Sequence, residues 1–248
     1  LYSTTVGCVF TDFFSEGPNG LHETMIRRIA PYSLRGFLYY QGEEDVQRYA
    51  DYSDMMLMLV KQWRMDWNDW NLPFLFVQLP MYLADGEKDD GCWALQREQQ
   101  YIASMMIQNA GMISLADCGE YDNIHPLDKK TPGERLFQLA ENLVYGKQGT
   151  ITATAAQLFS EDGKLYVTFD YLHEKLVMQT ANGCPFEISG EDNLFYPAKA
   201  DIIHGNMLCI SNPAVKFPSA VKYAWYNFGE AVLFAESGNP VSPFFKSV

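Results

Sequence analysis

The residues best suited to acid–base chemistry lie in the segment LADCGEYDNIHP, residues 115–126. Asp122 and His125 stand three positions apart there, in a loop expected between a short apolar strand and a helix. A carboxylate and an imidazole held on one rigid loop are suited to general acid–base catalysis near neutral pH. The bland alternatives are that His125, which precedes a proline, is a surface residue and that Asp122 only caps the next turn.

A base of this kind needs a nucleophile, and the sequence contains no G-x-S-x-G, GDS or GQSN motif. Cys118 stands beside the loop, but the anionic neighbours Asp117 and Glu120 would raise the pKa of its thiol instead of activating it. Asp117 itself is expected to fix the loop by accepting backbone hydrogen bonds. The spacing of the five cysteines fits neither a zinc site nor a CxxC redox pair, and no cluster of ligands predicts a metal or another cofactor.

The composition excludes some partners. With 18 basic and 31 acidic residues the formal net charge is −13, which argues against nucleic-acid binding because phosphate contacts need a basic surface. No window approaches the about 20 apolar residues of a membrane span. Aromatic residues make up 15% of the chain. They fill cores more often than they line ligand clefts, so core packing is the preferred interpretation.

The elements that must position this loop divide the chain into two parts. Up to residue 148, continuously apolar strands alternate with helices, which predicts a parallel sheet covered on both faces. The expected strands are 35–41, 73–79 and 112–116, and the expected helices are 21–29, 46–67, 93–108 and 129–145. From residue 149 short alternating strands separated by Gly- and Asn-rich turns predict a β-rich domain. Its expected strands are 164–169, 176–179, 198–203, 207–210, 220–225 and 231–234.

Several motifs occur in one order along the chain. They are GFLYYQGEED at 36–45, PFLFVQLPMY at 73–82, WALQREQQ at 93–100 and DCGEYDNIHPLDK at 117–129. Together with the C-terminal stretch AVKYAWYNFGEAVLFAESGNPVSPF, this set resembles the sialate O-acetylesterases, carbohydrate esterases of the SGNH-hydrolase superfamily. The resemblance implies an α/β fold: the C-terminal part of a flavodoxin-like three-layer α/β/α domain over 1–148, followed by a small β-rich domain over 149–248.

The resemblance also implies roles for single residues. His125 matches the catalytic base, and Asp122 the residue that orients it, with a backbone carbonyl in the stretch 123–124 as the alternative. Gln41 matches the oxyanion donor, while Gly42 and Glu43 belong to the loop that carries it. Arg97 and Gln100 match the helix motif that follows the second loop, where Arg97 forms a salt bridge or meets a sialate carboxylate.

This family carries its nucleophilic serine in a block after the first strand, and that block is missing from these 248 residues. We therefore expect an N-terminal half of the same protein, upstream of residue 1 or present as a separate chain. The implied activity is that of a serine carboxylesterase that removes O-acetyl groups from sialic acid or a related sugar, without cofactor or metal. An acetylxylan-type esterase and an inactive carbohydrate-binding relative are the alternatives. The family further implies a secreted or periplasmic location.

Overall fold

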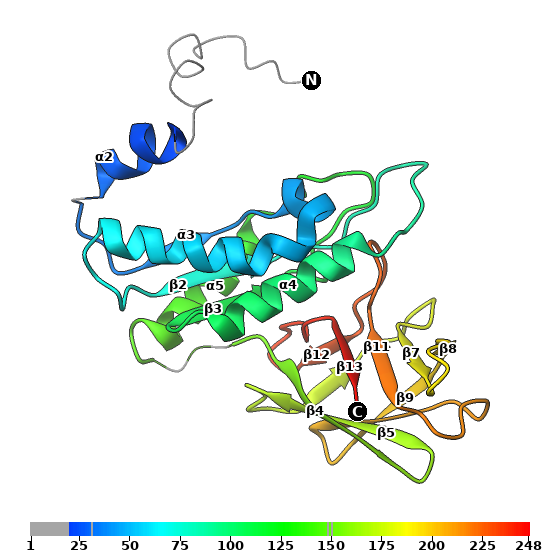
Figure 1. The fold of residues 1–248 in the computed structure, drawn as a ribbon. Coiled ribbons are helices and arrows are strands. Elements are labelled where there is room, and N and C mark those ends of the chain that lie inside the picture. Colours follow the sequence, from blue (N-terminus) through cyan, green and yellow to red (C-terminus); the bar gives the residue numbers. More distant parts are fainter. Residues whose placement is uncertain (1–19, 31, 148, 150) are drawn as a thin grey trace.

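Three parallel strands form the centre of the first part of the chain (Figure 1). The computed structural model describes residues 20–248 except 31, 148 and 150. The strands are β1 (Phe37–Tyr39), β2 (Phe74–Gln78) and β3 (Ala110–Ser114), in the order β1-β2-β3. All three predicted strands are therefore present, but β3 begins two residues earlier than predicted because Ala110 and Gly111 pair with Phe74 and Leu75.

Helices cover both faces of this sheet. The helices α3 (Tyr52–Asp66) and α4 (Cys92–Met106) lie on one face, and α5 (Lys130–Leu143) lies on the other (Figure 1). Successive strand residues point to opposite faces. Accordingly, Phe74 and Phe76 pack in one apolar cluster with residues of α3 and α4, whereas Leu75 and Val77 pack with residues of α5.

Two of the predicted helices are less regular than their periodicity suggested. The first is a π-helical segment, η1 (His22–Ile26), continued by the short α2 (Arg27–Ile29). The second divides into a 3₁₀ segment, η2 (Glu43–Asp51), and the α-helix α3, with Arg48 outside helical geometry at φ −125° and ψ 28°. The segment η2 begins directly after Gly42, so the loop after β1 passes straight into a helix.

The second part of the chain is built of antiparallel strands. One sheet has the order β4-β5-β10-β9, a second has β13-β11-β7-β8, and β12 pairs with β6. The strands are β4 (Thr154–Glu161), β5 (Lys164–Asp170), β6 (Leu176–Met178), β7 (Phe186–Ser189), β8 (Tyr196–Pro197), β9 (Lys199–Ile203), β10 (Met207–Ser211), β11 (Ala220–Tyr223), β12 (Leu233–Ala235) and β13 (Phe244–Ser247). All six expected strands are present, and β4, β7, β8 and β13 were missed.

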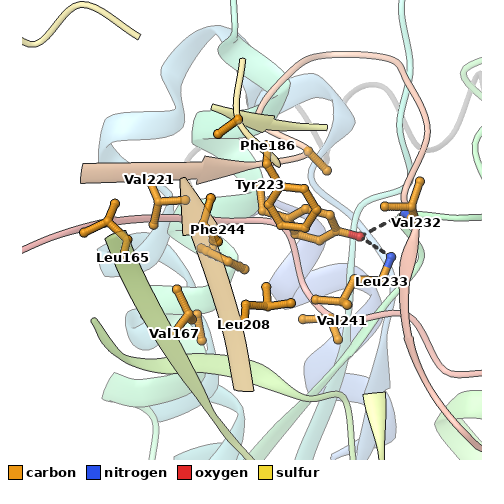
Figure 2. Close-up of a cluster of buried hydrophobic side chains, with 14 of the residues drawn as sticks. Leu165, Val167, Phe186, Leu208, Val221, Tyr223, Val232, Leu233, Val241 and Phe244 are labelled. Carbon is orange, nitrogen blue, oxygen red and sulfur yellow. Dashed lines mark hydrogen bonds between the residues drawn. The ribbon is translucent and has the colours of Figure 1, made fainter. Parts of the chain in front are cut away.

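The core of the β-rich part surrounds the fully buried ring of Tyr223 (Figure 2). The Tyr223 hydroxyl accepts hydrogen bonds from the backbone N–H groups of Val232, at 3.0 Å, and Leu233, at 2.8 Å. Met81 and Ala116, from the loops after β2 and β3, belong to the same apolar cluster. The β-rich part therefore packs directly against the two loops that follow these strands.

Candidate active site

Three loops meet at the carboxyl ends of the parallel strands. An apolar cluster joins them, with Val46, Leu79 and Trp93 buried at its centre and Tyr40 and Ile124 packed against it. Tyr40 follows β1, Leu79 follows β2 and Ile124 lies in the segment after β3. Tyr40 directly precedes Gln41, and Ile124 directly precedes His125. The Lys129 ammonium lies 5.4 Å from the centre of the Tyr40 ring, a second contact between the first and third segments. Open α/β sheets bind their ligands at this edge.

Gln41 is held in one orientation by its neighbours. Its Nε2 atom donates to Asp45 Oδ2 at 2.7 Å, and its Oε1 atom accepts from the Tyr39 hydroxyl at 3.0 Å. A carboxylate can only accept here, so the amide nitrogen must face Asp45. Burial, with Asp45 and Glu43 nearby, raises the pKa of Tyr39 to about 12, which keeps its hydroxyl a donor. The amide has a second N–H, which can serve as a donor to a ligand.

Gly42 cannot be replaced without strain. Its φ is +145°, and an added Cβ would lie 3.0 Å from Gln100 Nε2, 3.1 Å from Gln96 Nε2 and 3.3 Å from Leu79 Cδ1. Glu43, the next residue, begins η2 and is half-buried. The structure thus places Gln41, Gly42 and Glu43 together on one tight turn, as the motif predicted.

Gln100 and Arg97 are both fully buried on α4. Gln100 Oε1 accepts from the backbone N–H of Leu79 at 2.8 Å, and its Nε2 donates to the backbone oxygen of Gln41 at 3.4 Å. Gln100 therefore links the Gln41 turn to the loop after β2 by hydrogen bonds. A Gln100 side chain with no exposed surface does not itself contact a ligand.

The expectation that Arg97 meets a substrate carboxylate or forms a salt bridge is wrong for this structure. Its guanidinium has no exposed surface and donates through Nη2 to the backbone oxygen of Tyr226, in the β-rich part. Burial lowers the pKa of Arg97 to about 10, and its Nε and Nη1 atoms have no hydrogen-bond partner among the described residues. Arg97 joins the two parts of the chain.

His125 lies on an exposed, tightly folded loop. Its backbone N–H donates to Asn123 Oδ1 at 3.1 Å, and Asn123 Nδ2 donates to Glu120 Oε2 at 2.7 Å. Glu120 Oε1 also accepts from the backbone N–H of Leu127 at 2.6 Å. These hydrogen bonds lower the pKa of Glu120, so its carboxylate stays charged and fixes the loop on both sides of His125.

Asp122 has a different partner from the one expected. Its Oδ1 accepts from the backbone N–H of Asp85 at 2.9 Å, its own N–H donates to the Leu83 oxygen at 2.9 Å, and its φ is +56°. Asp tolerates this left-handed conformation better than most residues do. Within the described part of the chain no hydrogen bond joins the Asp122 carboxylate to the His125 ring. The role of Asp122 in orienting His125 stays a prediction.

Asp117 was expected to accept hydrogen bonds from backbone N–H groups. Among the described residues its carboxylate is instead bound by an arginine side chain. Arg135, on α5, donates to Asp117 Oδ1 at 2.6 Å and to Oδ2 at 2.7 Å, and also to the Ser114 oxygen at 3.0 Å. Burial, followed by the charge of Asp117, raises the pKa of Cys118 to about 12. The predicted inertness of this thiol therefore agrees with its surroundings.

Sequence reasoning missed Asn227, which lies 3% exposed between β11 and β12. It binds the loop after β2 and the first turn of α4, 134 or more residues away in sequence. Nothing in the local stretch YNFGE predicts such a partner.

Among the residues that the structure describes, no group of three or more His, Cys, Asp or Glu could hold a metal ion. In the same residues no helix is long and apolar enough to cross a membrane.

Comparisons with known proteins point to one family. A family profile described as carbohydrate esterase, sialic acid-specific acetylesterase, matches residues 4–140. The mouse sialate O-acetylesterase is 26% identical over 258 residues, covering 92% of this chain and 47% of the relative. The human sialate O-acetylesterase is 26% identical over 189 residues, covering 68% of this chain and 36% of the relative.

A solved structure gives the same result. The crystal structure of a carbohydrate acetylesterase from Xanthomonas citri matches with a TM-score of 0.84 and 31% identity, covering 92% of this chain and 54% of that one. The chain thus spans about half the length of the relatives that it matches. The resemblance inferred from the ordered motifs is confirmed. The chain belongs to the carbohydrate esterase family of sialic acid-specific acetylesterases.

Proposed function

We propose that this chain forms the C-terminal part of a serine esterase that removes O-acetyl groups from sialic acid or a related acetylated sugar. The observation that carries the proposal is the convergence of the Gln41 turn and the His125 loop at the carboxyl edge of the sheet, around one apolar cluster. A donor amide and an imidazole at the same sheet edge are the parts that acyl transfer needs besides the nucleophile.

The reaction follows from these roles. A serine on a segment upstream of residue 1 attacks the acetyl carbonyl carbon while His125 takes its proton. The second N–H of Gln41 stabilises the oxyanion that develops, an effect of about 2.7–4 kcal/mol for one well-placed donor. The tetrahedral intermediate then breaks its bond to the sugar oxygen, which receives the proton from His125. Water, activated by the same imidazole, releases acetate from the serine.

The sheet itself supports a further segment beside β1. Leu38 pairs in register with Leu75, so both side chains point to the α5 face. Leu75 is 1% exposed under α5, whereas Leu38 is 63% exposed. We propose that the N-terminal portion of the protein covers Leu38, extends the sheet past β1 into a flavodoxin-like SGNH domain, and brings the nucleophile. A secreted or periplasmic location is proposed from the family alone.

The test uses the full-length protein and a fluorophosphonate probe, with labelled peptides mapped by mass spectrometry. We expect one labelled serine upstream of residue 1, and loss of both label and ester turnover in His125→Ala. His173→Ala, at an exposed loop histidine of the β-rich part, is the matched control and should keep full activity. Turnover near the wild-type level in His125→Ala would show that His125 is not the base.

The substrate class is tested on the same preparation. Acetate release from O-acetylated sialic acid is compared with release from acetylated xylan. Preference for the sialic acid ester supports the proposed substrate, and preference for xylan assigns the chain to the acetylxylan-type alternative. Sugar binding without turnover of either ester would indicate an inactive carbohydrate-binding relative.

A further inference from the structure

The N-cap residue of helix α4 offers no side-chain acceptor. The residue before its first turn is Gly91, in the left-handed conformation at φ +76°, and it has no side chain to accept a hydrogen bond. The first N–H groups of a helix have no partner inside the helix and need one from elsewhere. Asp90 Oδ1 accepts from the Cys92 N–H at 3.0 Å, so one of these groups is satisfied locally.

Asn227 supplies the next acceptor from the β-rich part. Its Oδ1 accepts from the Trp93 N–H at 3.0 Å, and its Nδ2 donates to Asp90 Oδ1 at 2.9 Å. Its backbone N–H donates to Asp89 Oδ2 at 2.8 Å, and its backbone oxygen accepts from the Tyr82 N–H at 2.9 Å. The Asn227 amide oxygen thus satisfies an N-terminal N–H group that the side chain at the N-cap position satisfies in many helices. One buried residue thus binds both ends of the segment 82–93.

Each end of that segment leads to one half of the candidate site. At one end, the backbone oxygen of Leu83 accepts from the Asp122 N–H, and the backbone N–H of Asp85 donates to Asp122 Oδ1. Asp122 lies on the His125 loop. At the other end, Gln100 lies seven residues beyond Trp93 on α4, about 10 Å along the axis, and holds the Leu79 N–H and the Gln41 oxygen.

A third contact lies next to Asn227. The ring of Phe228 meets that of Tyr121, also on the His125 loop, edge to face at 5.6 Å. The stretch 227–228 therefore contacts the His125 loop directly, through Phe228, and indirectly, through the segment 82–93.

We infer that Asn227 is a positioning residue of the esterase site, which makes the β-rich part a component of the catalytic machinery. This inference rests on the proposed function. Asn227 touches neither Gln41 nor His125; it fixes the segment that sets the distance between them. Because reaction rates depend on near-ångström placement of the reacting groups, loosening this segment lowers kcat more than it changes KM.

The first comparison sets Asn227→Ala against Asn212→Ala in the full-length protein. Asn212 is a matched control in the same β-rich part: its Nδ2 donates to the Pro197 oxygen at 2.7 Å, and its Oδ1 accepts from the Ala214 N–H at 2.8 Å. We expect kcat with 4-nitrophenyl acetate and the rate of fluorophosphonate labelling to fall about 10–100-fold in Asn227→Ala, with KM within about threefold. Asn212→Ala should keep both rates. Equal kcat in the two folded variants would overturn the inference.

A second pair of variants decides the case if Asn227→Ala does not fold. Asn227→Asp keeps the acceptor for the Trp93 N–H but places a second carboxylate against Asp90, and should lower kcat. Adding Asp90→Asn restores an amide–carboxylate hydrogen bond, now with the amide at position 90 and the carboxylate at position 227. The kcat of this double variant should be at least tenfold higher than that of Asn227→Asp alone. Failure of the double variant to recover would contradict the positioning role.

Amide hydrogen exchange separates this inference from the proposed function. In Asn227→Ala or Asn227→Asp, peptides over 41–46 and 118–127 should exchange faster than in the wild type, and in Asn212→Ala they should not. If the wild-type protein has no ester turnover but shows this exchange pattern, the coupling stands and the function falls. If turnover is present and exchange at both loops is unchanged, the inference falls and the function stands.

Discussion

The ion pair between Asp117 and Arg135 gives the sharpest stability prediction. Both guanidinium–carboxylate hydrogen bonds are short, 2.6 and 2.7 Å, and the side chains are only 23% and 10% exposed. Asp117→Ala would leave the Arg135 charge under the loop without its partner. Breaking a buried pair in this way costs about 3–5 kcal/mol of unfolding free energy. Because this pair is partly exposed, we expect about 2–3 kcal/mol, or about 4–12 °C in Tm.

Urea unfolding followed by circular dichroism measures this cost, and a double variant tests its cause. Arg135→Met together with Asp117→Ala removes both charges, so its loss should be smaller than the sum of the two single losses by about 1.5–3 kcal/mol. Strictly additive losses, or a loss below about 0.5 kcal/mol for Asp117→Ala, a typical surface value, would refute the reasoning.

The same double variant separates a structural Asp117 from a catalytic one. Replacing the acid of a Ser-His-Asp triad lowers kcat about 10⁴-fold, however stable the variant is. An Asp117 that only anchors the loop predicts instead that the double variant keeps kcat within about tenfold of the wild type, a barrier change of about 1.4 kcal/mol or less. A 10⁴-fold loss in a well-folded double variant would transfer the orienting role to Asp117.

Two further predictions follow from backbone strain and from thiol burial. Gly42→Ala should lower the free energy of unfolding by about 1–3 kcal/mol. Gly133→Ala, on α5, should raise it by about 0.5–1 kcal/mol, because the new Cβ would meet no atom within 4 Å beyond its chain neighbours and the nearby backbone of its own helix. Equal unfolding midpoints in the two variants would contradict this account of Gly42. With its pKa raised from 9.0 to about 12, Cys118 should react with iodoacetamide at pH 8 about a thousandfold more slowly than an ordinary thiol. Rapid labelling of Cys118 in the folded protein would refute the raised pKa. In the unfolded chain the Cys118 thiol loses its proton at a lower pH than in the folded protein, so the free energy of unfolding should fall as the pH rises from 9 towards 12. This fall should be less steep in Cys118→Ser.

The elements that could be predicted from the sequence are those with a local signal. The apolar runs around 35–41 and 73–79 both form strands, as expected. Every residue of β2 is buried, because both of its faces are covered. In β1 only Phe37 is buried and Leu38 is exposed, so the prediction of a buried strand is wrong for 35–41. The start of β3 was missed because Ala110 and Gly111 carry little hydrophobic signal. Gly111 lets α5 pack closely on β3, since an added Cβ would lie 2.4 Å from Leu143 Cδ1 and the Leu143 side chain would have to shift.

The missed strands share another cause. The strand β13 has partners in β11, and β7 has partners in β11 and β8, so their pairing depends on residues elsewhere in the chain. In the site, motif order placed Gln41, Gly42 and His125 correctly at one sheet edge. It could not say which way α4 turns its polar side chains, and so Arg97 was left between a salt bridge and a substrate carboxylate, whereas its guanidinium donates to the Tyr226 oxygen.

The buried polar face of α4 has a physical explanation. Gln96, Arg97 and Gln100 are all fully buried, because α4 is covered by the sheet and the Gln41 turn on one side and by the β-rich part on another. A helix buried only against a sheet would carry apolar residues at these positions. Arg97 and Gln100 exchange hydrophobic burial for directional bonds, and those of Gln100 fix the position of the Gln41 turn more narrowly than packing alone can. The Gln96 amide has no hydrogen-bond partner among the described residues.

The exposed edge of the sheet connects folding to catalysis. Leu38 remains 63% exposed beside a fully buried Leu75. Covering the rest of this residue is worth about 1–2 kcal/mol, because complete burial of a leucine is worth about 1.5–3 kcal/mol. The same edge strand leads directly into Gln41, the proposed oxyanion donor. A segment that packs on Leu38 would therefore stabilise β1 and also hold the turn that follows it. The residues proposed for catalysis in this chain depend in this way on the same neighbour that we propose brings the nucleophile.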